Sequence, residues 1–335
     1  MRGVSTTFHH QPPPLPMQYL FGTLIEGVMG PLIRFQERRG NAVKFFSRQH
    51  DMMEKRTRKK NPFLKYTPGA QDVFVMTYAK SGTNWMMQIA HQLIHRGRGD
   101  YQHLHDLVPW PDTTIMPLFM KRYAIPIEQA THWQQAPERM RVIKTHYNWD
   151  LLPYSDQAKY IAVIRDPKDV FVSNYVFVRD GVYGRAMPTL DTWYELFLSA
   201  HFPLGGSWAV NTAGYWAERH RPNVMITSFK AMKRDLRGTV ADVARFLGID
   251  APDALVDEVT RLASFDYMKQ NDHKYAMGQT VPWRKPGSMI RKGTQGGSSE
   301  MLSLERQREI DRHFMAELER LGSDFPYREF CDVTP

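Results

Sequence analysis

The sequence predicts a three-layer α/β/α domain in which helices cover both faces of a central, mainly parallel sheet. Two observations lead to this prediction. Short apolar runs recur at residues 73–76, 141–143, 160–164 and 224–226, and longer stretches with helical spacing of apolar residues separate them. Strands that are apolar at every position are buried on both faces, as in parallel sheets between two layers of helices. The 335 residues suffice for one large domain of this kind.

Helical periodicity places the connecting helices in order. The first continues from the first strand through residues 86–94, and others are predicted at 190–201, 206–220 and 237–247. The last covers residues 299–321, where apolar residues fall at steps of three and four. Strands and helices that alternate in this way are typical of open α/β folds.

Residues 1–68 are predicted to form an extension in front of the main domain, which covers residues 69–330. Apolar residues between positions 19 and 35 recur at helical spacing, and a basic run follows at 55–60. The opposite face of this helix carries Gly22, Glu26 and Gly30. We expect a helix docked on the core, followed by a solvated charged segment. The alternative is an interfacial helix that makes peripheral contact with anionic lipid; the stretch is short of the ~20 uninterrupted apolar residues of a spanning helix.

The composition points to an anionic partner and a reducing compartment. The formal net charge is +9 and the pI is about 9.5, which suits a nucleic acid, an acidic membrane or a polyphosphorylated small molecule. The single cysteine, Cys331, excludes a disulfide within the chain. Because the start also has no recognisable secretory signal, we expect a cytoplasmic protein.

A phosphate-binding turn follows the first strand. Residues 78–85 read Tyr-Ala-Lys-Ser-Gly-Thr-Asn-Trp and lead into a helix. The free N–H groups of such a turn and helix start point at one spot, where Lys80 adds a cation and Gly82 allows close approach. The P-loop of nucleoside triphosphatases needs Lys where Thr83 stands and Ser or Thr where Asn84 stands. The hydroxyl that binds magnesium is therefore missing, which speaks against a nucleotide kinase.

Further polar side chains follow the second and third strands. Arg165 ends the third strand and Ser173 lies on the next helix, so that a guanidinium and a hydroxyl can converge on one anion. His146 follows the second strand, at the carboxyl edge where ligands bind in open α/β sheets. A cluster of possible metal ligands is formed by His103, His105 and Asp106, but no further group supports it and we expect no metal site.

These segments resemble those of the cytosolic sulfotransferases over residues 72–327. Residues 78–85 resemble the family's 5′-phosphosulfate loop, although Ala79 stands where the family usually has Pro and Asn84 where it often has Thr. Three later segments match in the family's order: Lys-Thr-His at 144–146, Arg-Asp-Pro-Lys-Asp-Val-Phe-Val-Ser at 165–173 and Arg-Lys-Gly at 291–293. Several motifs in one order make this resemblance specific.

The resemblance implies a P-loop-like fold and the donor 3′-phosphoadenosine 5′-phosphosulfate (PAPS), which leaves as adenosine 3′,5′-bisphosphate (PAP). By the family pattern, His146 is the base that takes the acceptor proton, and Lys80, with Lys144, stabilises the leaving oxygen. The expected donor-binding residues are Lys80, Ser81, Gly82, Thr83, Asn84, Trp85, Arg165, Ser173, Phe229, Phe265, Arg291, Lys292 and Gly293. No metal is expected, because a sulfuryl group carries less charge than a phosphoryl group.

The acceptor is expected to be an apolar or aromatic hydroxyl compound. Aromatic residues gather in the segments from which the family builds its acceptor pocket, namely Trp110, Phe119, Trp133, Tyr147, Trp149 and Tyr175. Apolar walls favour a phenol, a steroid-like alcohol or a lipid-like alcohol over a bare sugar.

One other class of function remains open. A non-catalytic anion- or membrane-binding protein with a vestigial nucleotide site would explain the positive charge. It would not explain the joint presence of Lys80, His146, Arg165, Ser173 and Arg291. We expect no nucleic-acid partner, and residues 296–300 replace the family's dimer element, which leaves the oligomeric state open.

Overall fold

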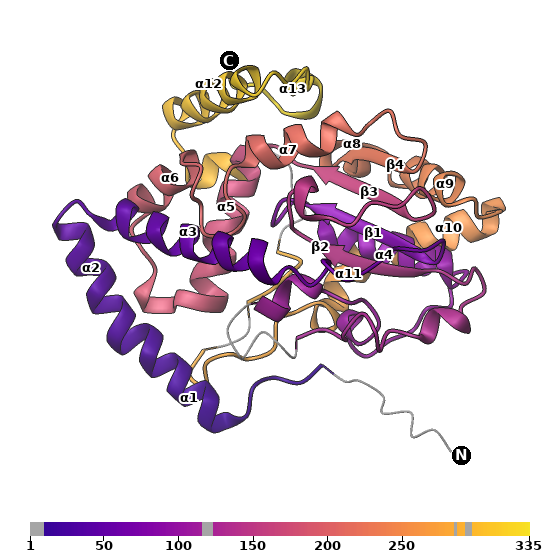
Figure 1. Cartoon of the computed structure of the whole chain (residues 1–335), viewed down its shortest axis with the longest axis horizontal. Coiled ribbons are helices and arrows are strands. Elements are labelled where there is room, and N and C mark those ends of the chain that lie inside the picture. Colours follow the sequence, from indigo (N-terminus) through magenta and orange to yellow (C-terminus); the bar gives the residue numbers. More distant parts are fainter. Residues whose placement is uncertain (1–9, 116–122, 285–286, 292–296) are drawn as a thin grey trace.

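The computed structural model describes residues 10–115, 123–284, 287–291 and 297–335 (Figure 1). Its centre is a parallel sheet of four strands in the order β2-β1-β3-β4. The strands are β1 (Asp72–Thr77), β2 (Arg141–Thr145), β3 (Lys159–Ile164) and β4 (Val224–Ser228). All four predicted strands are confirmed, and so is the parallel sheet.

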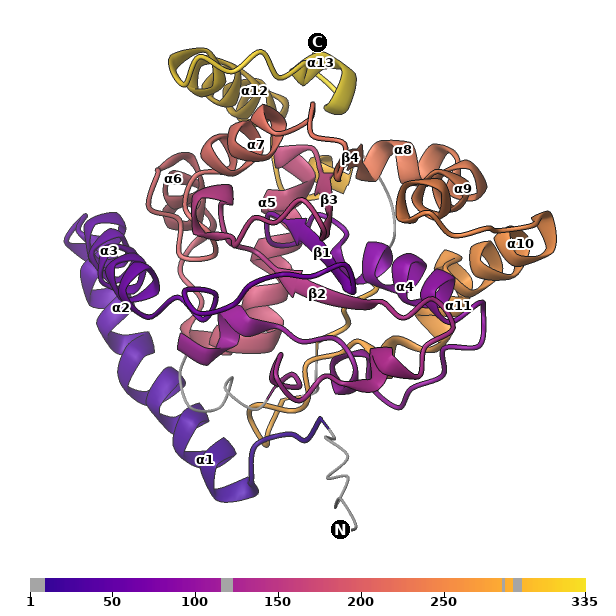
Figure 2. The same ribbon diagram turned by 45° about the vertical axis from the view of Figure 1, so that its right-hand side comes forward.

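Helices cover both faces of the sheet, which confirms the three-layer prediction (Figures 1 and 2). Val73 and Val75 of β1 are buried in the core that α4 (Thr83–Ile94), α9 (Leu236–Leu247) and α10 (Asp253–Leu262) share. Phe74 and Met76 are buried in a separate cluster on the other face. The helices on this side are α5 (Pro167–Val178), α6 (Leu190–Leu198), α7 (Trp208–Ala217) and α12 (Leu304–Arg320). Short helices complete the domain: α8 (Phe229–Arg234), α11 (Phe265–Gln270) and α13 (Tyr327–Phe330).

The predicted helices are present, but two of them begin later than predicted, at residues that follow a capping side chain. The hydroxyl of Ser207 accepts a hydrogen bond from the backbone of Val210, so α7 begins later than predicted. Ser303 caps α12 in the same way, and the residues before it form a separate 3₁₀ turn (Gly297–Glu300). A capping side chain therefore decides where each of these helices begins.

The N-terminal residues form one long rod and a returning helix at the outer edge of the molecule (Figures 1 and 2). The rod consists of α1 (Leu15–Thr23), a π-helical segment (Leu24–Met29) and α2 (Gly30–Arg38). The returning helix is α3 (Ala42–Lys60). The basic run at 55–60 was expected in a solvated segment, but it is the last part of α3. No described helix is long and apolar enough to cross a membrane.

The rod is docked as expected, but only part of its apolar stripe meets the domain. Ile33 is buried in the core and Met29 packs against it, as the stripe predicts. Gly22 and Gly30 are also buried, whereas Leu20, Leu24 and Val28 are exposed. The glycines widen the docked face, because they allow close approach of the neighbouring segments. A Cβ atom at Gly22 would lie 2.6 Å from the ring of Trp283.

The parallel sheet brings the candidate residues together. The loops after β1, β2, β3 and β4 all leave the carboxyl edge, where open α/β sheets bind their ligands. Lys80, His146, Arg165 and Phe229 follow the four strands in turn.

Candidate active site

The turn after β1 has the backbone of an anion-binding loop. Lys80 and Gly82 both have positive φ, +73° and +100°, and α4 begins at the next residue, Thr83. A Cβ atom at Gly82 would lie 2.9 Å from the ring of Phe229, so Gly is required for conformation and for space. Alternating backbone conformations followed by a helix N-terminus direct several N–H groups at one concave spot.

This turn opens into one large cavity with a volume of about 1220 Å³. We call the part nearest the turn the donor half; it is lined by Lys80, Gly82, Thr83, Asn84, Trp85, Arg165, Ser173, Phe229, Phe265 and Arg291. Ser81 does not line the cavity, because its side chain is buried beneath the turn. Lys292 and Gly293 lie outside the described residues. The structure thus brings together the described donor residues that the sequence predicted, except Ser81.

Arg165 is held in place by groups of the same half. One guanidinium nitrogen, Nη1, donates to the backbone oxygen of Lys80 at 3.1 Å. The guanidinium carbon lies 4.2 Å from the centre of the Phe229 ring. Asp169, one turn into α5, lies 3.6 Å from the other terminal nitrogen. A planar cation that is fixed on three sides is suited to bind an anion with defined geometry.

The aromatic side chains of the donor half form a wall around Arg165. The rings of Trp85 and Phe229 meet edge to face, with centroids 5.3 Å apart. The indole nitrogen of Trp85 donates to the backbone oxygen of Ala263 at 2.8 Å, which fixes the ring. Arg291 reaches this side of the cavity and pairs with Glu300 at 3.1 Å. The wall therefore offers flat apolar surface for a purine and a second guanidinium for an anion.

His146 is oriented so that one ring nitrogen is left for chemistry. Its Nδ1 lies 2.9 Å from the backbone oxygen of Thr77, which can only accept a hydrogen bond. In the neutral imidazole Nδ1 must then carry the hydrogen, and Nε2 carries the lone pair. Burial, and next the charge of Lys144, lower the pKa of His146 to about 3. The ring is therefore neutral at physiological pH.

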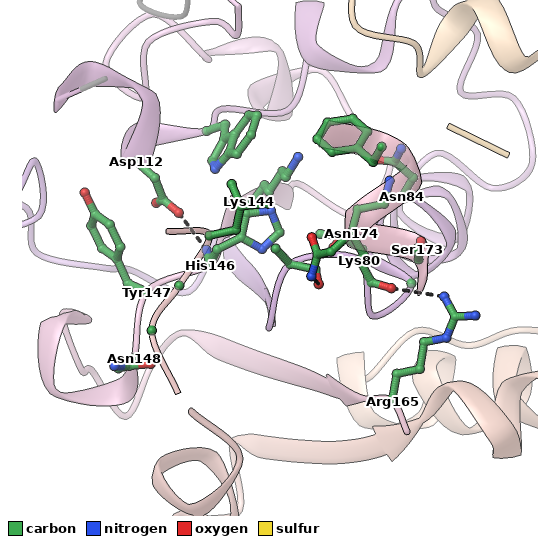
Figure 3. Close-up of a pocket in the computed structure, with 18 of the residues that line it drawn as sticks. Lys80, Asn84, Asp112, Lys144, His146, Tyr147, Asn148, Arg165, Ser173 and Asn174 are labelled. Atoms are coloured by element: carbon green, nitrogen blue, oxygen red, sulfur yellow. Dashed lines mark hydrogen bonds between the residues drawn. The ribbon is translucent and has the colours of Figure 1, made fainter. Parts of the chain in front are cut away.

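Two lysines, buried Lys144 and half-buried Lys80, flank His146 and face the cavity (Figure 3). The ammonium nitrogen of Lys144 lies 3.5 Å from the centre of the Trp110 ring, and that of Lys80 lies 4.1 Å from the centre of the Phe177 ring. Burial lowers the pKa of each lysine to about 7; the charge of Arg165 lowers that of Lys80 further. The site thus brings several basic side chains close together, a state that a bound polyanion would stabilise.

Asp112 belongs to the site although sequence reasoning missed it. Its carboxylate accepts the backbone N–H of His146 at 2.6 Å and the hydroxyl of Thr145 at 3.0 Å. Burial raises its pKa to about 6, and these two hydrogen bonds oppose the rise. Asp112 lies in a 3₁₀ turn (Pro111–Ile115) far from β2 in the chain, so no local pattern connects it to His146. It fixes the backbone from which the histidine projects.

The second part of the cavity, the acceptor half, is lined by Trp110, Asp112, Tyr123, Tyr147, Trp149, Phe177 and Met277, with Phe21 from α1. Of the predicted acceptor residues, Trp110, Tyr147 and Trp149 line it. Tyr175 and Trp133 are not among the lining residues: Tyr175 stacks on Phe171, and Trp133 lies in a 3₁₀ turn (His132–Gln134). Phe119 lies outside the described residues. Tyr123, Phe177, Met277 and Phe21 were not predicted.

The cluster around His103 has other contacts than a metal. His105 Nδ1 lies 3.0 Å from the backbone oxygen of Val108, and the carboxylate of Asp106 accepts the backbone N–H of His103 at 3.1 Å. Among the described residues, a different group, His50, Asp51 and His201, brings potential ligand atoms within 4.8 Å of one another. In it, His201 Nδ1 is hydrogen-bonded to the Asp51 carboxylate at 2.6 Å.

Comparison with known proteins agrees with the geometry. The family model for the sulfotransferase domain matches residues 70–322. The amine sulfotransferase of Oryctolagus cuniculus is 29% identical over 78% of this chain and 84% of its own length. The 3-beta-hydroxysteroid sulfotransferase of Cavia porcellus is 25% identical over 76% of this chain and 86% of its own length.

Solved structures share the fold. Retinol dehydratase in complex with androsterone and the inactive cofactor PAP has a TM-score of 0.67, with 20% identity over 80% of this chain and 88% of that chain. The mouse sulfotransferase SULT7A1 complexed with PAP has a TM-score of 0.58, with 24% identity over 77% of this chain and 88% of that chain. With the family match over most of the chain, the fold and the site define the class: the chain belongs to the sulfotransferase family and is a PAPS-dependent sulfotransferase.

Proposed function

We propose that this enzyme transfers the sulfuryl group of PAPS to the hydroxyl of an apolar or aromatic acceptor, with His146 as the base. The observation that carries the proposal is the 2.9 Å contact between His146 Nδ1 and the oxygen of Thr77. It assigns the lone pair to Nε2, and a lone pair beside the acceptor hydroxyl is what the reaction needs.

The transfer is an in-line displacement at sulfur. The acceptor oxygen forms a bond to sulfur, its proton moves to His146 Nε2, and the bond between sulfur and the bridging oxygen of the donor breaks. The electron pair of that bond leaves on the 5′-phosphate of PAP. Lys80, with Lys144, stabilises this charge, which is larger in the transition state than in bound PAPS. The negative donor also raises the pKa of His146 and of both lysines above the values of the free enzyme.

The remaining donor residues hold PAP in place. The turn at residues 80–85 surrounds the 5′-phosphate, and Arg165, Ser173 and Arg291 bind the 3′-phosphate. Trp85, Phe229 and Phe265 pack around the adenine. The guanidinium of Arg291 is partly exposed and pairs with Glu300. When the donor binds, it leaves Glu300 and binds the more highly charged phosphate.

The acceptor class follows from the walls of the acceptor half. Its aromatic and aliphatic side chains favour a flat or elongated apolar molecule that presents one hydroxyl to His146. The relatives named above include proteins described as steroid and amine sulfotransferases, and one solved neighbour contains androsterone. We propose a hydroxyl as the acceptor group, because the neutral imidazole of His146 can accept the proton that a hydroxyl loses during attack.

The domain limits and the location belong to the same proposal. Residues 1–68 are an extension of the sulfotransferase domain at 69–330, and the N-terminal rod gives peripheral contact with a membrane. The single cysteine, buried Cys331, fits the reducing cytoplasm.

The experiment is a transfer assay with PAPS that carries a labelled sulfuryl group. Phenols, steroids, long-chain alcohols, amines and sugars serve as acceptors, each with excess EDTA and with added magnesium. We expect labelled sulfate esters of the apolar alcohols or phenols, formed equally well in EDTA. Transfer that needs magnesium contradicts the mechanism, and binding of PAP without transfer to any acceptor supports the vestigial alternative.

A further inference from the structure

The N-terminal rod presents an apolar stripe to solvent. Leu20, Leu24 and Val28 expose 70%, 50% and 56% of their surface, and Leu32 and Phe35 continue the stripe. A repeat of four residues drifts by about 40° per step around an α-helix. The π-helical segment (Leu24–Met29) has more residues per turn, which offsets the drift and keeps the stripe on one side.

The rod cannot bury this stripe by rotating. Its other face is already fixed to the domain, where Glu26 pairs with Arg284 at 3.2 Å and both side chains are largely buried. Trp283 donates to the same carboxylate at 3.2 Å. Gly30 packs against Ala186, because a Cβ atom there would lie 3.1 Å from that side chain. Rotation would break the ion pair and bring leucines against tight backbone contacts, so the exposed stripe is the stable outer face.

Positive charge and aromatic rings accompany the stripe. Between residues 30 and 60 the chain holds ten lysines and arginines against three acidic residues. The guanidinium of Arg39 lies 4.9 Å from the centre of the Phe35 ring, so the basic region adjoins the stripe directly. At the other end, the half-exposed rings of Tyr19 and Trp283 lie 5.9 Å apart. Amphipathic aromatics beside an apolar, basic helix are typical of the membrane interface.

We propose that the rod docks on an anionic lipid surface, with the stripe at the level of the acyl boundary and the basic residues at the headgroups. The charge pattern selects this occupant over a second copy of the chain, since two such regions would repel each other. Phe21, on the same helix, lines the acceptor half of the cavity. The docked enzyme therefore holds its cavity beside the bilayer. If the proposed function holds, its acceptor is an alcohol that partitions into the membrane.

The test uses the full-length protein and vesicles of phosphatidylcholine with or without phosphatidylserine. We expect at least tenfold stronger cosedimentation with the anionic vesicles, and weaker binding at high salt. The variant Leu24→Glu/Val28→Glu is expected to lose at least tenfold of this binding. The matched control is Leu304→Glu, a leucine that is 60% exposed at the start of α12, which lies apart from α1, and it is expected to bind like the wild type (Figures 1 and 2).

Three readouts separate the possible results. A PAP-induced thermal shift of normal size shows that the variants are folded. Equal vesicle binding by the stripe variant and the wild type overturns the proposal, and so does a wild-type dimer that the stripe variant converts to a monomer without any vesicle binding. Transfer to a soluble phenol without vesicles reports on the proposed function separately: its failure, with vesicle binding intact, contradicts the enzyme assignment and not the docking.

Discussion

The donor half and the acceptor half of the cavity differ in how the chain assembles them. Most of the donor half comes from residues directly after strands, such as Lys80 after β1 and Arg165 after β3. Apart from Tyr147 and Trp149, which follow β2, the acceptor half comes from separate places: Phe21 on the N-terminal rod, Trp110 before β2 and Met277 after α11. The sheet therefore fixes the first half by its register, while the second half depends on how distant segments pack.

The largest expected effect separates chemistry from donor binding. His146→Ala is expected to lower kcat by about 10²–10⁴, the usual value of a positioned general base, and to leave PAP affinity within a few-fold of wild type. His146→Asn keeps a donor for the Thr77 oxygen but supplies no base, so it is expected to be nearly as inactive. Calorimetry measures the affinity and labelled transfer measures kcat. A kcat near wild type in His146→Ala, with chemistry rate-limiting, removes the residue from the mechanism.

The next effect concerns the 3′-phosphate. Arg165→Ala removes a charge-assisted contact to a desolvated anion, and PAP binding is expected to weaken by about 2–4 kcal/mol, or about 30- to 900-fold. For the nucleotide without the 3′-phosphate, the same substitution is expected to weaken binding much less. Arg245→Ala, an exposed arginine on α9, is the charge-matched control and should bind PAP normally. An Arg165→Ala enzyme that still prefers the 3′-phosphorylated nucleotide as strongly as wild type places the phosphate elsewhere.

The sequence predicted the fold and most of the donor half for one reason: both depend on local patterns. Apolar strands, a turn with Gly82 and polar residues at strand ends are visible within a few residues of one another. Asp112 was missed because its partner His146 is distant in the chain. Periodicity predicted a docked helix at the N-terminus, but it could not predict that the apolar residues would divide, with Ile33 buried and Leu20 and Leu24 exposed. The tight contact at Gly22, which depends on a residue distant in the chain, also has no local signal.

The pH dependence of donor binding is the third effect. In the free enzyme the pKa of Lys80 and of Lys144 is lowered from 10.5 to about 7, chiefly by burial, and a bound anion raises both again. PAP therefore binds with its full affinity below about pH 7. The affinity declines as the pH rises further, because a deprotonated lysine must regain a proton before it can bind the anion. We expect a loss of about tenfold per pH unit for each lysine that is coupled in this way.

The matched variant for this effect is Lys80→Arg. Arginine stays charged over this range, so the decline should become shallower. Calorimetric titrations at constant ionic strength between pH 6 and 9 measure both profiles. Affinity that rises with pH, or identical profiles for the two proteins, contradicts the assignment of these pKa values.

The smallest effect tests the acceptor half. Tyr147 lines the acceptor half, and its hydroxyl, which is buried in this structure, has no hydrogen-bond partner among the described residues; we therefore expect it to pair with a polar group of the bound acceptor. Tyr147→Phe should raise the KM for the acceptor by about 2- to 10-fold, the value of one hydrogen bond, with unchanged PAP affinity. Tyr175→Phe makes the same chemical change outside the cavity and should leave KM unchanged. Equal KM values in both variants place the acceptor elsewhere in the cavity.

The most direct test of the central claim, that the loop after β1 binds the PAPS nucleotide without magnesium, is a calorimetric comparison of PAP and ATP. The wild-type enzyme is titrated with PAP in EDTA, and separately with ATP in excess magnesium. The account predicts binding of one PAP per chain in EDTA, unchanged by magnesium, and much weaker binding of ATP. Tighter binding of ATP with magnesium, or loss of PAP binding in EDTA, would contradict it.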